Sequence, residues 1–490
     1  MSDSDLQHTI SLKDFVSRDY FQPKTLFAAR KYFSLVLYAA SLSSIRLVEK
    51  LFGTTLYVAS SKQGMHALDK IVRDTLHTLL LHKVIMGWKT YVLRIGAITQ
   101  THCEIPAGFV QNQEGKILIA QRTLTAAGVG KDANEATKIA LAELAERVAT
   151  CYWNSKDFEV SSISNLKKNN KSVLAHSYIR ELKSEAETEE YDWCSVRDLH
   201  TDKPMYINPE FLFITYKDPR RNKHTFVDSS SNGSAVETTR EKALAAAINE
   251  LFERDGFLMY WLNRIAPPKI DPESIGNNFV KTIIKDFESR NFSVHILDCQ
   301  SEYPIPVLVL VLVDNHSGGV YVQAAAGIDP DKNLIKVFKD VLHWDVDERF
   351  VGTSIAYEDL KAISSRKKLW HSGQMRNEIE FFLTGKMQTY QEYVSNLPTK
   401  SKKQTEFEYV TAVLKDNNLQ TLWYRYEHDL LTDFRLYGVR VLIPELMPIY
   451  FYEQYKHRNV PRLFVFAKRM GYTDTVLHIN DLNPIPHPFL

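Results

Sequence analysis

Hydrophobic residues change their spacing near residue 90, and the change predicts two kinds of structure. Leu, Phe, Val and Ile recur at helical spacing over residues 24–51 and 64–86, with few Gly or Pro. From Tyr91 onward, shorter strand-like runs alternate with loops and further helices. We therefore expect a mostly helical N-terminal appendage at residues 1–90, followed by a larger α+β domain at residues 91–490.

Short runs rich in Val, Ile, Leu and Tyr predict the strands of the larger domain. These strands are expected at residues 91–98, 116–124, 205–216, 225–227, 294–297, 307–313, 320–326 and 439–443. A helix is expected at residues 331–344. The polar stretch at residues 161–172 and the acidic stretch at 184–192 are expected to bracket a surface loop. Basic or polar composition predicts exposed loops at 217–224 and through 363–404, which includes the basic run Arg366–Lys368.

One helical pattern occurs twice in the chain with identical spacing. The first copy is Ala136, Ala140, Glu143, Leu144, Glu146 and Arg147, and the second is Ala243, Ala247, Glu250, Leu251, Glu253 and Arg254. Each copy follows strand-like sequence and a loop with Gly or Ser, at residues 128–131 and 229–234. This order predicts an internal duplication of a strand–loop–acidic-helix unit.

The repeated residue types suit the binding of a metal and a phosphate. Positions i, i+3 and i+4 share one face of a helix, so each copy presents two carboxylates beside a guanidinium. If the helices face each other, four carboxylates and two arginines surround one cavity. Carboxylates are ligands for hard cations such as Mg²⁺, and Arg suits phosphate. The alternative is a solvated face with weak ion pairs, but such a face has no reason to repeat its Ala positions.

Composition excludes several other classes of protein. Hydrophobic residues make up 44% of the chain and the net charge is +1, which indicates a folded core without a strong field for nucleic acid or membrane binding. The four cysteines form no C-x-x-C pair, which argues against a zinc ribbon and fits a cytoplasmic protein. The longest apolar runs, at residues 33–41 and 79–88, are too short to span a bilayer.

With both acidic helices and their preceding loops in view, the chain resembles the YcaO family of ATP-dependent enzymes that modify peptide amides. The resemblance rests on GVGKDANEATKIALAELAER (128–147) and SSNGSAVETTREKALAAAINELFER (230–254), and it extends from Tyr91 to the C-terminus. It implies a YcaO-type fold with ATP and Mg²⁺ as cofactors.

The C-terminus narrows the resemblance. Pro484, Pro486 and Pro488 form a P-x-P-x-P tail that is similar to the end of azoline-forming cyclodehydratases. Proline favours an extended rod, so such a tail can place the Leu490 carboxylate in a cleft, where it would orient the substrate or act as general base. A solvated end and a docking ligand for a partner remain alternatives.

Residue roles follow from the resemblance. It implies that Glu143, Glu146, Glu250 and Glu253 hold Mg²⁺, and that Arg147 and Arg254 face phosphates or lock the carboxylates. Asn232 would join the metal–phosphate cluster and Lys131 would touch phosphate. The chain departs from the family after Asn232-Gly233, where Ser234–Glu237 replaces Gly-rich sequence. A second departure is the third helix, where Asp340 and His343 replace Glu-x-x-Gln, so His343 is either a ligand or a packed residue.

The implied function is ATP-dependent cyclodehydration of Cys, Ser or Thr in a ribosomally made precursor peptide, giving thiazoline or oxazoline. The chain would be the D-protein-like, ATP-using subunit of a heterocycle synthetase. Its partners would be the precursor peptide, a leader-binding partner protein and an FMN-dependent azoline dehydrogenase. Thioamide or amidine formation at the same ATP site, and a silent peptide-binding scaffold, are the alternatives.

Overall fold

The computed structural model describes residues 68–81, 84–85, 87–95, 98–111, 117–120, 125–174, 188–219, 229–343, 360, 363–397, 404–453 and 460–489. These residues belong to two compact units, Met1–Val148 and Ala149–Leu490. The helix predicted at residues 24–51 lies outside the described residues. Because most of the predicted appendage is also outside them, its boundary at residue 90 stays a prediction.

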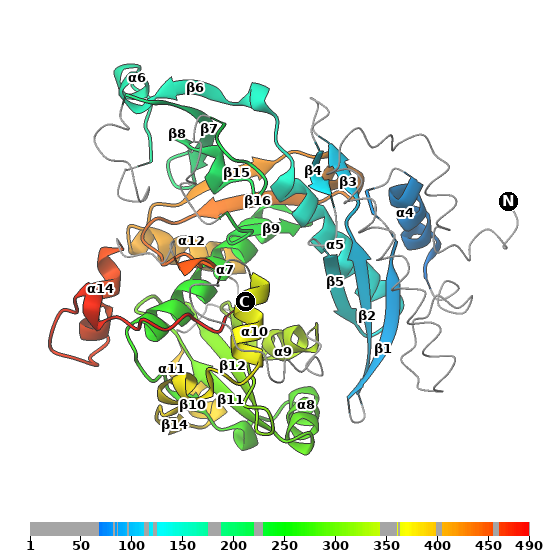
Figure 1. Cartoon of the computed structure of the whole chain (residues 1–490), viewed down its shortest axis with the longest axis vertical. Coiled ribbons are helices and arrows are strands. Elements are labelled where there is room, and N and C mark those ends of the chain that lie inside the picture. Colours follow the sequence, from blue (N-terminus) through cyan, green and yellow to red (C-terminus); the bar gives the residue numbers. More distant parts are fainter. Residues whose placement is uncertain are drawn as a thin grey trace, which may run out of the picture. The chain divides into compact units, whose positions relative to one another are not determined.

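Among its described residues, the first unit has a small antiparallel sheet and the helices α4 and α5 (Figure 1). The strand order is β1-β2-β5, with β1 at Lys89–Ile95, β2 at Ile98–Pro106 and β5 at Thr125–Gly130. A separate hairpin joins β3 (Phe109–Gln111) to β4 (Ile117–Ala120). The helices are α4 (Lys70–Leu81) and α5 (Ala133–Cys151), the first acidic helix.

Small residues allow β5 to lie close against α5. A Cβ atom built on Gly128 would lie 2.2 Å from the carbonyl oxygen of Ala136, and one on Gly130 would lie 2.5 Å from the Ala136 nitrogen. Ala136 and Ala140 are completely buried. Ala136 and Ala140 of the first copy therefore serve close packing. The predicted turn at residues 128–131 is instead largely the end of strand β5.

The second unit contains two mostly antiparallel sheets. The first has the order β6-β7-β15-β16-β9, with β8 also paired to β7; its strands are β6 (Glu159–Ser162), β7 (Glu190–Asp198), β8 (Pro204–Ile207), β15 (Leu422–Tyr426), β16 (Tyr437–Leu442) and β9 (Ser234–Glu237). The second has the order β13-β12-β11-β10-β14; its strands are β13 (Val320–Ala326), β12 (Val307–Asp314), β11 (Phe292–Asp298), β10 (Lys269–Ile270) and β14 (Met387–Gln388). Only β10 and β14 pair in parallel among these strands of the described chain.

The second acidic helix, α7 (Arg240–Leu262), lies between these two sheets (Figure 1). It packs against β9 and β16 on one side and against β12 and β13 on the other. Every residue of β12 is buried. Val309, Val311 and Val313 share one core with α7, and because side chains alternate along a strand, the leucines between them face the other side. The sheets thereby fix α7 along its length.

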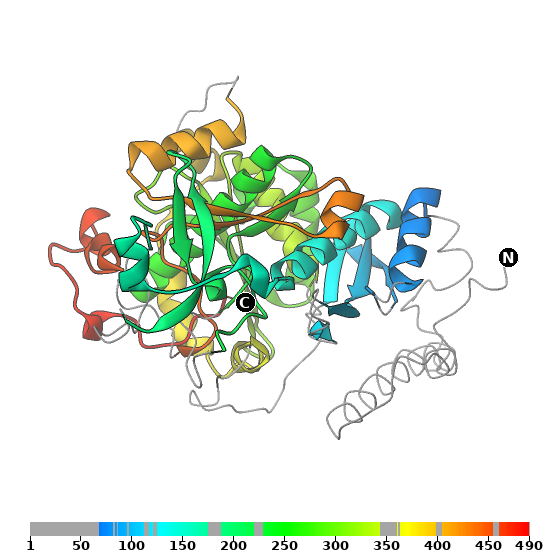
Figure 2. The same cartoon turned by 90° about the horizontal axis from the view of Figure 1, so that it is seen from above.

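Shorter helices complete the second unit. They are α6 (Ile163–Lys168), α8 (Asn278–Ser289), α9 (Pro330–Asp340), α10 (Ile363–His371), α11 (Tyr390–Asn396), α12 (Glu406–Asp416), α13 (Asp429–Asp433) and α14 (Pro461–Arg469). Helix α12 packs directly on α7, and Figure 2 shows it over the second unit. No helix among the described residues is both long enough and apolar enough to cross a membrane.

Two local predictions were wrong, and one strand was missed. Residues 363–404 are not a wholly exposed insertion, because α10 buries Arg366, Leu369 and Trp370. The strand predicted at 205–216 ends at Ile207 and is followed by a 3-10 turn at Pro209–Phe211. Strand β9, which lies between the Ser-rich loop and α7, was not predicted at all. The predicted strand at 225–227 lies outside the described residues.

Candidate active site on the two acidic helices

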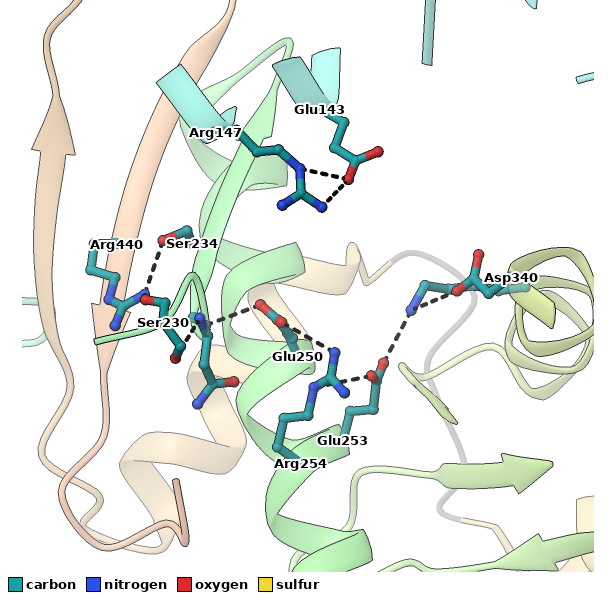
Figure 3. Close-up of polar contacts among 12 residues, drawn as sticks. Glu143, Arg147, Ser230, Ser234, Glu250, Glu253, Arg254, Asp340 and Arg440 are labelled. Atoms are coloured by element: carbon teal, nitrogen blue, oxygen red, sulfur yellow. Dashed lines mark hydrogen bonds and ion pairs between the residues drawn. The ribbon is translucent and has the colours of Figure 1, made fainter. Parts of the chain in front are cut away.

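Glu250 ties the middle of α7 to the loop that precedes the helix. Its Oε2 accepts the backbone N–H of Gly233 at 3.0 Å, and its Oε1 lies 3.5 Å from Arg254 Nη2 (Figure 3). Gly233 has φ +79°, and a Cβ there would lie 2.5 Å from the carbonyl oxygen of Val441, so glycine is required. Burial raises the pKa of the Glu250 carboxyl, although the charge of Arg254 opposes this.

Glu143 on α5 makes the same two contacts. Its Oε2 accepts the backbone N–H of Ala127 at 2.8 Å, and Arg147 one turn later donates to its other oxygen (Figure 3). The duplication in sequence is therefore also a duplication of hydrogen bonding. In each copy the first glutamate holds the preceding segment and the arginine pairs with that glutamate. The predicted single cavity between the two helices stays a prediction.

Arg254 and Asn232 retain buried polar atoms that no described residue satisfies. The Nε and Nη1 atoms of Arg254 lack a hydrogen-bond acceptor among the described residues, and Nε reaches only ion-pair distance, 3.5 Å, from Glu253 Oε1. Asn232 Oδ1 likewise has no donor there, and its side chain is buried. Because buried polar atoms are nearly always paired in folded proteins, these atoms indicate a ligand. Such a ligand would offer hydrogen-bond acceptors to Arg254 and a cation or a donor to Asn232 Oδ1.

Glu253 has a second cationic neighbour on α9. Lys336 Nζ lies 3.0 Å from Glu253 Oε2 and 3.7 Å from Asp340 Oδ2 (Figure 3). The side chain of Glu253 is only 4% exposed. Loss of hydration disfavours the charged form of Lys336, but the two carboxylates outweigh this and its pKa is raised. The ammonium of Lys336 therefore keeps its charge across the physiological pH range.

A buried arginine on β16 braces the loop before α7 (Figure 3). Arg440 donates from Nη1 to Ser230 O at 2.8 Å and to Ser234 Oγ at 3.1 Å, and from Nε to Phe211 O at 3.1 Å. Ser234 Oγ also lies 3.2 Å from the hydroxyl of Tyr426. Both ends of the segment that carries Asn232 and Gly233 are thus attached to the sheet.

The C-terminal tail is buried rather than frayed. Pro484 is exposed, but Pro486, His487, Pro488 and Phe489 are buried. The chain enters this position through Asn483, whose backbone N–H donates to Leu262 O at 2.7 Å and whose Nδ2 donates to Trp261 O at 3.2 Å. The tail thus starts at the C-terminal end of α7.

Aromatic and basic side chains then hold the tail's carbonyl groups. Trp261 Nε1 donates to Ile485 O at 3.1 Å, Trp370 Nε1 to Pro486 O at 3.2 Å, and Arg366 Nη1 to His487 O at 2.9 Å. His487 Nε2 lies 2.7 Å from Tyr450 O. The Phe489 ring ends the described tail against Arg254, 4.1 Å from Cζ to the ring centroid. The tail therefore runs back along α7 to the acidic residues.

The other predicted site residues are placed as follows. Lys131 is exposed between β5 and α5, and Glu146 is half-buried on α5. His343 is the last residue of the 3-10 turn after α9, and its side chain is not described. Leu490 lies outside the described residues. No group of three or more His, Cys, Asp or Glu able to hold a metal is found within the described part of the chain.

The family model described as YcaO cyclodehydratase, ATP- and Mg²⁺-binding, matches residues 127–447, about two thirds of the chain. The chain belongs to the YcaO family. The match contains both acidic helices, and ATP and Mg²⁺ are the cofactors of this family.

Solved structures have the same fold at low sequence identity. A heterocyclase in complex with substrate and cofactor is 18% identical with a TM-score of 0.63. The match covers 84% of this chain and 57% of the heterocyclase chain. YcaO from Methanopyrus kandleri bound with AMPPCP and Mg²⁺ is 15% identical with a TM-score of 0.55, covering 79% and 94%. The E. coli microcin synthetase McbBCD complex is 12% identical with a TM-score of 0.51, covering 73% and 88%. The chain spans little more than half the length of that first heterocyclase. The predicted YcaO-type α+β fold is confirmed.

The residues of this YcaO chain fit a magnesium–nucleotide complex. Glu250 and Asn232 Oδ1 provide oxygen ligands of the type that Mg²⁺ prefers, and Arg254 has N–H groups left for phosphate. Sequence reasoning missed Lys336, Arg440 and Arg366. Arg366 and Arg440 lie in segments without a motif, and Lys336 lies on the third helix but outside its Asp340 and His343 positions. Only the tertiary structure therefore brings each of them to the acidic helix, its loop or the tail.

Proposed function

We propose that this protein uses ATP to convert Cys, Ser or Thr residues of a ribosomally made peptide into thiazoline or oxazoline rings. The supporting observation is the repeated glutamate–arginine arrangement. Glu143 and Glu250 each accept a backbone N–H and each pair with an arginine four residues later. Membership of a family described as an ATP- and Mg²⁺-binding cyclodehydratase gives this arrangement its chemistry.

The proposed reaction joins a ring closure to phosphoryl transfer. The side-chain sulfur or oxygen attacks the preceding amide carbon, losing its proton, and the carbonyl π electrons move to the oxygen. That oxygen attacks the γ-phosphorus of ATP, and the bond to ADP breaks. The amide nitrogen then loses its proton and forms C=N, and the oxygen leaves as phosphate. Per ring, the peptide loses the elements of one water, and ATP gives ADP and phosphate.

Side chains of the acidic helices provide the positioning that phosphoryl transfer needs. In this proposal Glu143, Glu146, Glu250 and Glu253 surround the magnesium–ATP complex. Arg147 and Arg254 bind phosphate oxygens, and Asn232 adds a ligand from the loop. Lys131 is proposed to reach a phosphate from its exposed position. Mg²⁺ would neutralise phosphate charge.

The tail is proposed to complete the peptide end of the same site. Pro486 and Pro488 are buried, and Phe489 lies against Arg254. Carbonyl groups held by Trp261, Trp370 and Arg366 give the tail one conformation. A tail fixed beside the phosphate-binding arginine would orient the substrate amide toward ATP.

We propose that the chain acts with a leader-binding partner protein and an azoline dehydrogenase. One structure with the same fold is the microcin synthetase McbBCD complex, in which several proteins assemble. In the test, the protein is incubated with ATP, its partner protein and a precursor peptide encoded by a neighbouring gene. ATP-dependent loss of one water per ring, measured by mass spectrometry, is expected, and an unchanged peptide mass with ATP consumed would contradict the proposal.

A further inference from the structure

Lys336 already supplies a cation to the second acidic helix. Its ammonium lies between Glu253 and Asp340, at 3.0 Å and 3.7 Å. The other oxygen of Glu253 lies 3.5 Å from Arg254 Nε. Both oxygens of this nearly buried carboxylate therefore face positive charges of the chain itself, which is unusual for a residue expected to ligate a metal.

The position of Lys336 is fixed by the packing of α9. Asp329 caps the helix by accepting the N–H of Lys332 at 3.2 Å, and the buried Asn333 donates to Gly327 O at 2.7 Å. Lys336 and Asp340 are one turn apart on this helix, so their side chains share one face. The ammonium is thus held where that face meets Glu253 of α7.

Glu250 differs from Glu253 in what it faces. One of its oxygens accepts a single backbone N–H. Arg254 Nη2 lies 3.5 Å from the other oxygen, which is too long for a strong hydrogen bond. Its side chain is 26% exposed, against 4% for Glu253. The two glutamates of one motif therefore have different electrostatic surroundings, and Glu250 is the more open of the two to a ligand.

We propose that Lys336 occupies the place of a divalent ion between Glu253 and Asp340, and so limits the number of Mg²⁺ ions that bind with ATP. This inference rests on the proposed function, because it assumes that α7 binds metal and ATP. A divalent ion at Glu253 would have to displace the ammonium or lie beside it. Repulsion between a divalent ion and an ammonium about 4 Å away lowers the ion's affinity substantially, even in water.

Titration of the full-length protein with Mn²⁺, followed by electron paramagnetic resonance, tests this inference. It is carried out with and without AMPPCP on the parent, Lys336→Met and Lys332→Met. Lys332 is the matched control, since it lies one turn earlier on α9 and pairs with Asp329 at 3.5 Å. We expect Lys336→Met to bind one further Mn²⁺, or to bind Mn²⁺ about tenfold more tightly, with Lys332→Met unchanged.

A second substitution identifies the ligand. Adding Glu253→Gln to Lys336→Met should remove the gain, because the neutral amide is a poorer ligand than a carboxylate. Mn²⁺ binding that is equal or weaker in Lys336→Met than in the parent would overturn the inference while leaving the proposed function intact. Absence of AMPPCP-dependent Mn²⁺ binding in the parent and every variant would contradict the proposed function itself.

Discussion

The Phe489 ring lies against the Arg254 guanidinium, with 4.1 Å between Cζ and the ring centroid. An arginine over an aromatic face is attracted by the ring's electrons, and the ring also excludes water from the guanidinium. Two residues far apart in the second unit's sequence therefore meet at α7. The contact joins the proline-rich tail to the residue proposed to bind phosphate.

Replacing Trp370 by Phe tests whether the tail must be held. The variant keeps an aromatic ring but loses the N–H that donates to Pro486 O. We expect about 1 kcal/mol lower stability and a severalfold lower kcat for ring formation, with the KM for ATP unchanged. Trp153→Phe is the control, because it loses an N–H bond to Thr215 Oγ1 at 3.1 Å, far from the tail in sequence. An equal kcat in both variants would argue against a role for the tail.

Arg254→Lys keeps the charge but loses the planar fork that binds two oxygens together. The KM for ATP should rise about tenfold and kcat should fall, as measured by phosphate release at varied ATP. Arg240→Lys on the same helix is the control, since Arg240 lies over Trp423 at 4.7 Å. Unchanged constants for Arg254→Lys would leave Arg254 with only its ion pairs to Glu250 and Glu253.

Arg440→Lys should loosen the loop that carries Asn232. Lysine cannot reach Ser230 O, Phe211 O and Ser234 Oγ together, so buried acceptors lose their donors. We expect a stability loss of about 2 kcal/mol in urea unfolding and a severalfold higher KM for ATP. Arg425→Lys on the adjacent strand is the control, because Arg425 is exposed over Tyr437. A KM for ATP equal to that of the control would show that the loop does not contribute to ATP binding.

Asp298 makes stability depend on pH. Burial raises its pKa from 3.8 to about 6, although hydrogen bonds from Gln300 and Gln388 oppose this. The native state then holds the proton more tightly than the unfolded state, so stability falls as pH rises from 3.8 through 6. The full penalty above pH 6 is about 3 kcal/mol.

The variant Asp298→Asn lacks this penalty. Its unfolding free energy relative to the parent should therefore increase between pH 4 and pH 7, measured by urea unfolding at each pH. Asp474→Asn, at an exposed position, controls for the loss of one negative charge. A difference between Asp298→Asn and the parent that stays constant with pH would show that Asp298 does not titrate in this range.

The sequence predicted those parts of the fold whose patterns are local. The runs at 294–297, 307–313, 320–326 and 439–443 are the cores of β11, β12, β13 and β16, because a short run of β-branched and other apolar residues is a local signal for a strand. The prediction for residues 363–404 was wrong because the Lys and Ser content of this segment resembles that of a solvated loop. In fact α10 turns Arg366 and Trp370 toward the tail carbonyls.

The candidate site was likewise predicted only where its sequence pattern is local. The repeated E-x-x-E-R pattern located Glu143 and Glu250, because helix geometry alone sets which of these side chains share a face. It could not distinguish Glu250 from Glu253, since Lys336 approaches from a different helix. Likewise, the tail's prolines predicted an extended rod, but not the Trp261 and Trp370 donors that bury it.

In the proposed function, both acidic helices act in one ATP-dependent ring closure. The direct test is the mass of the precursor peptide after incubation with ATP, Mg²⁺, the partner protein and Glu143→Gln, Glu250→Gln or Glu241→Gln. Glutamine keeps the acceptor for Ala127 N or Gly233 N, so the fold should persist while metal binding is lost. We predict loss of water with the parent and with the exposed-site control Glu241→Gln, and at least about a hundredfold slower loss with each of the other two variants. Parent-like water loss with either Glu143→Gln or Glu250→Gln would contradict the account.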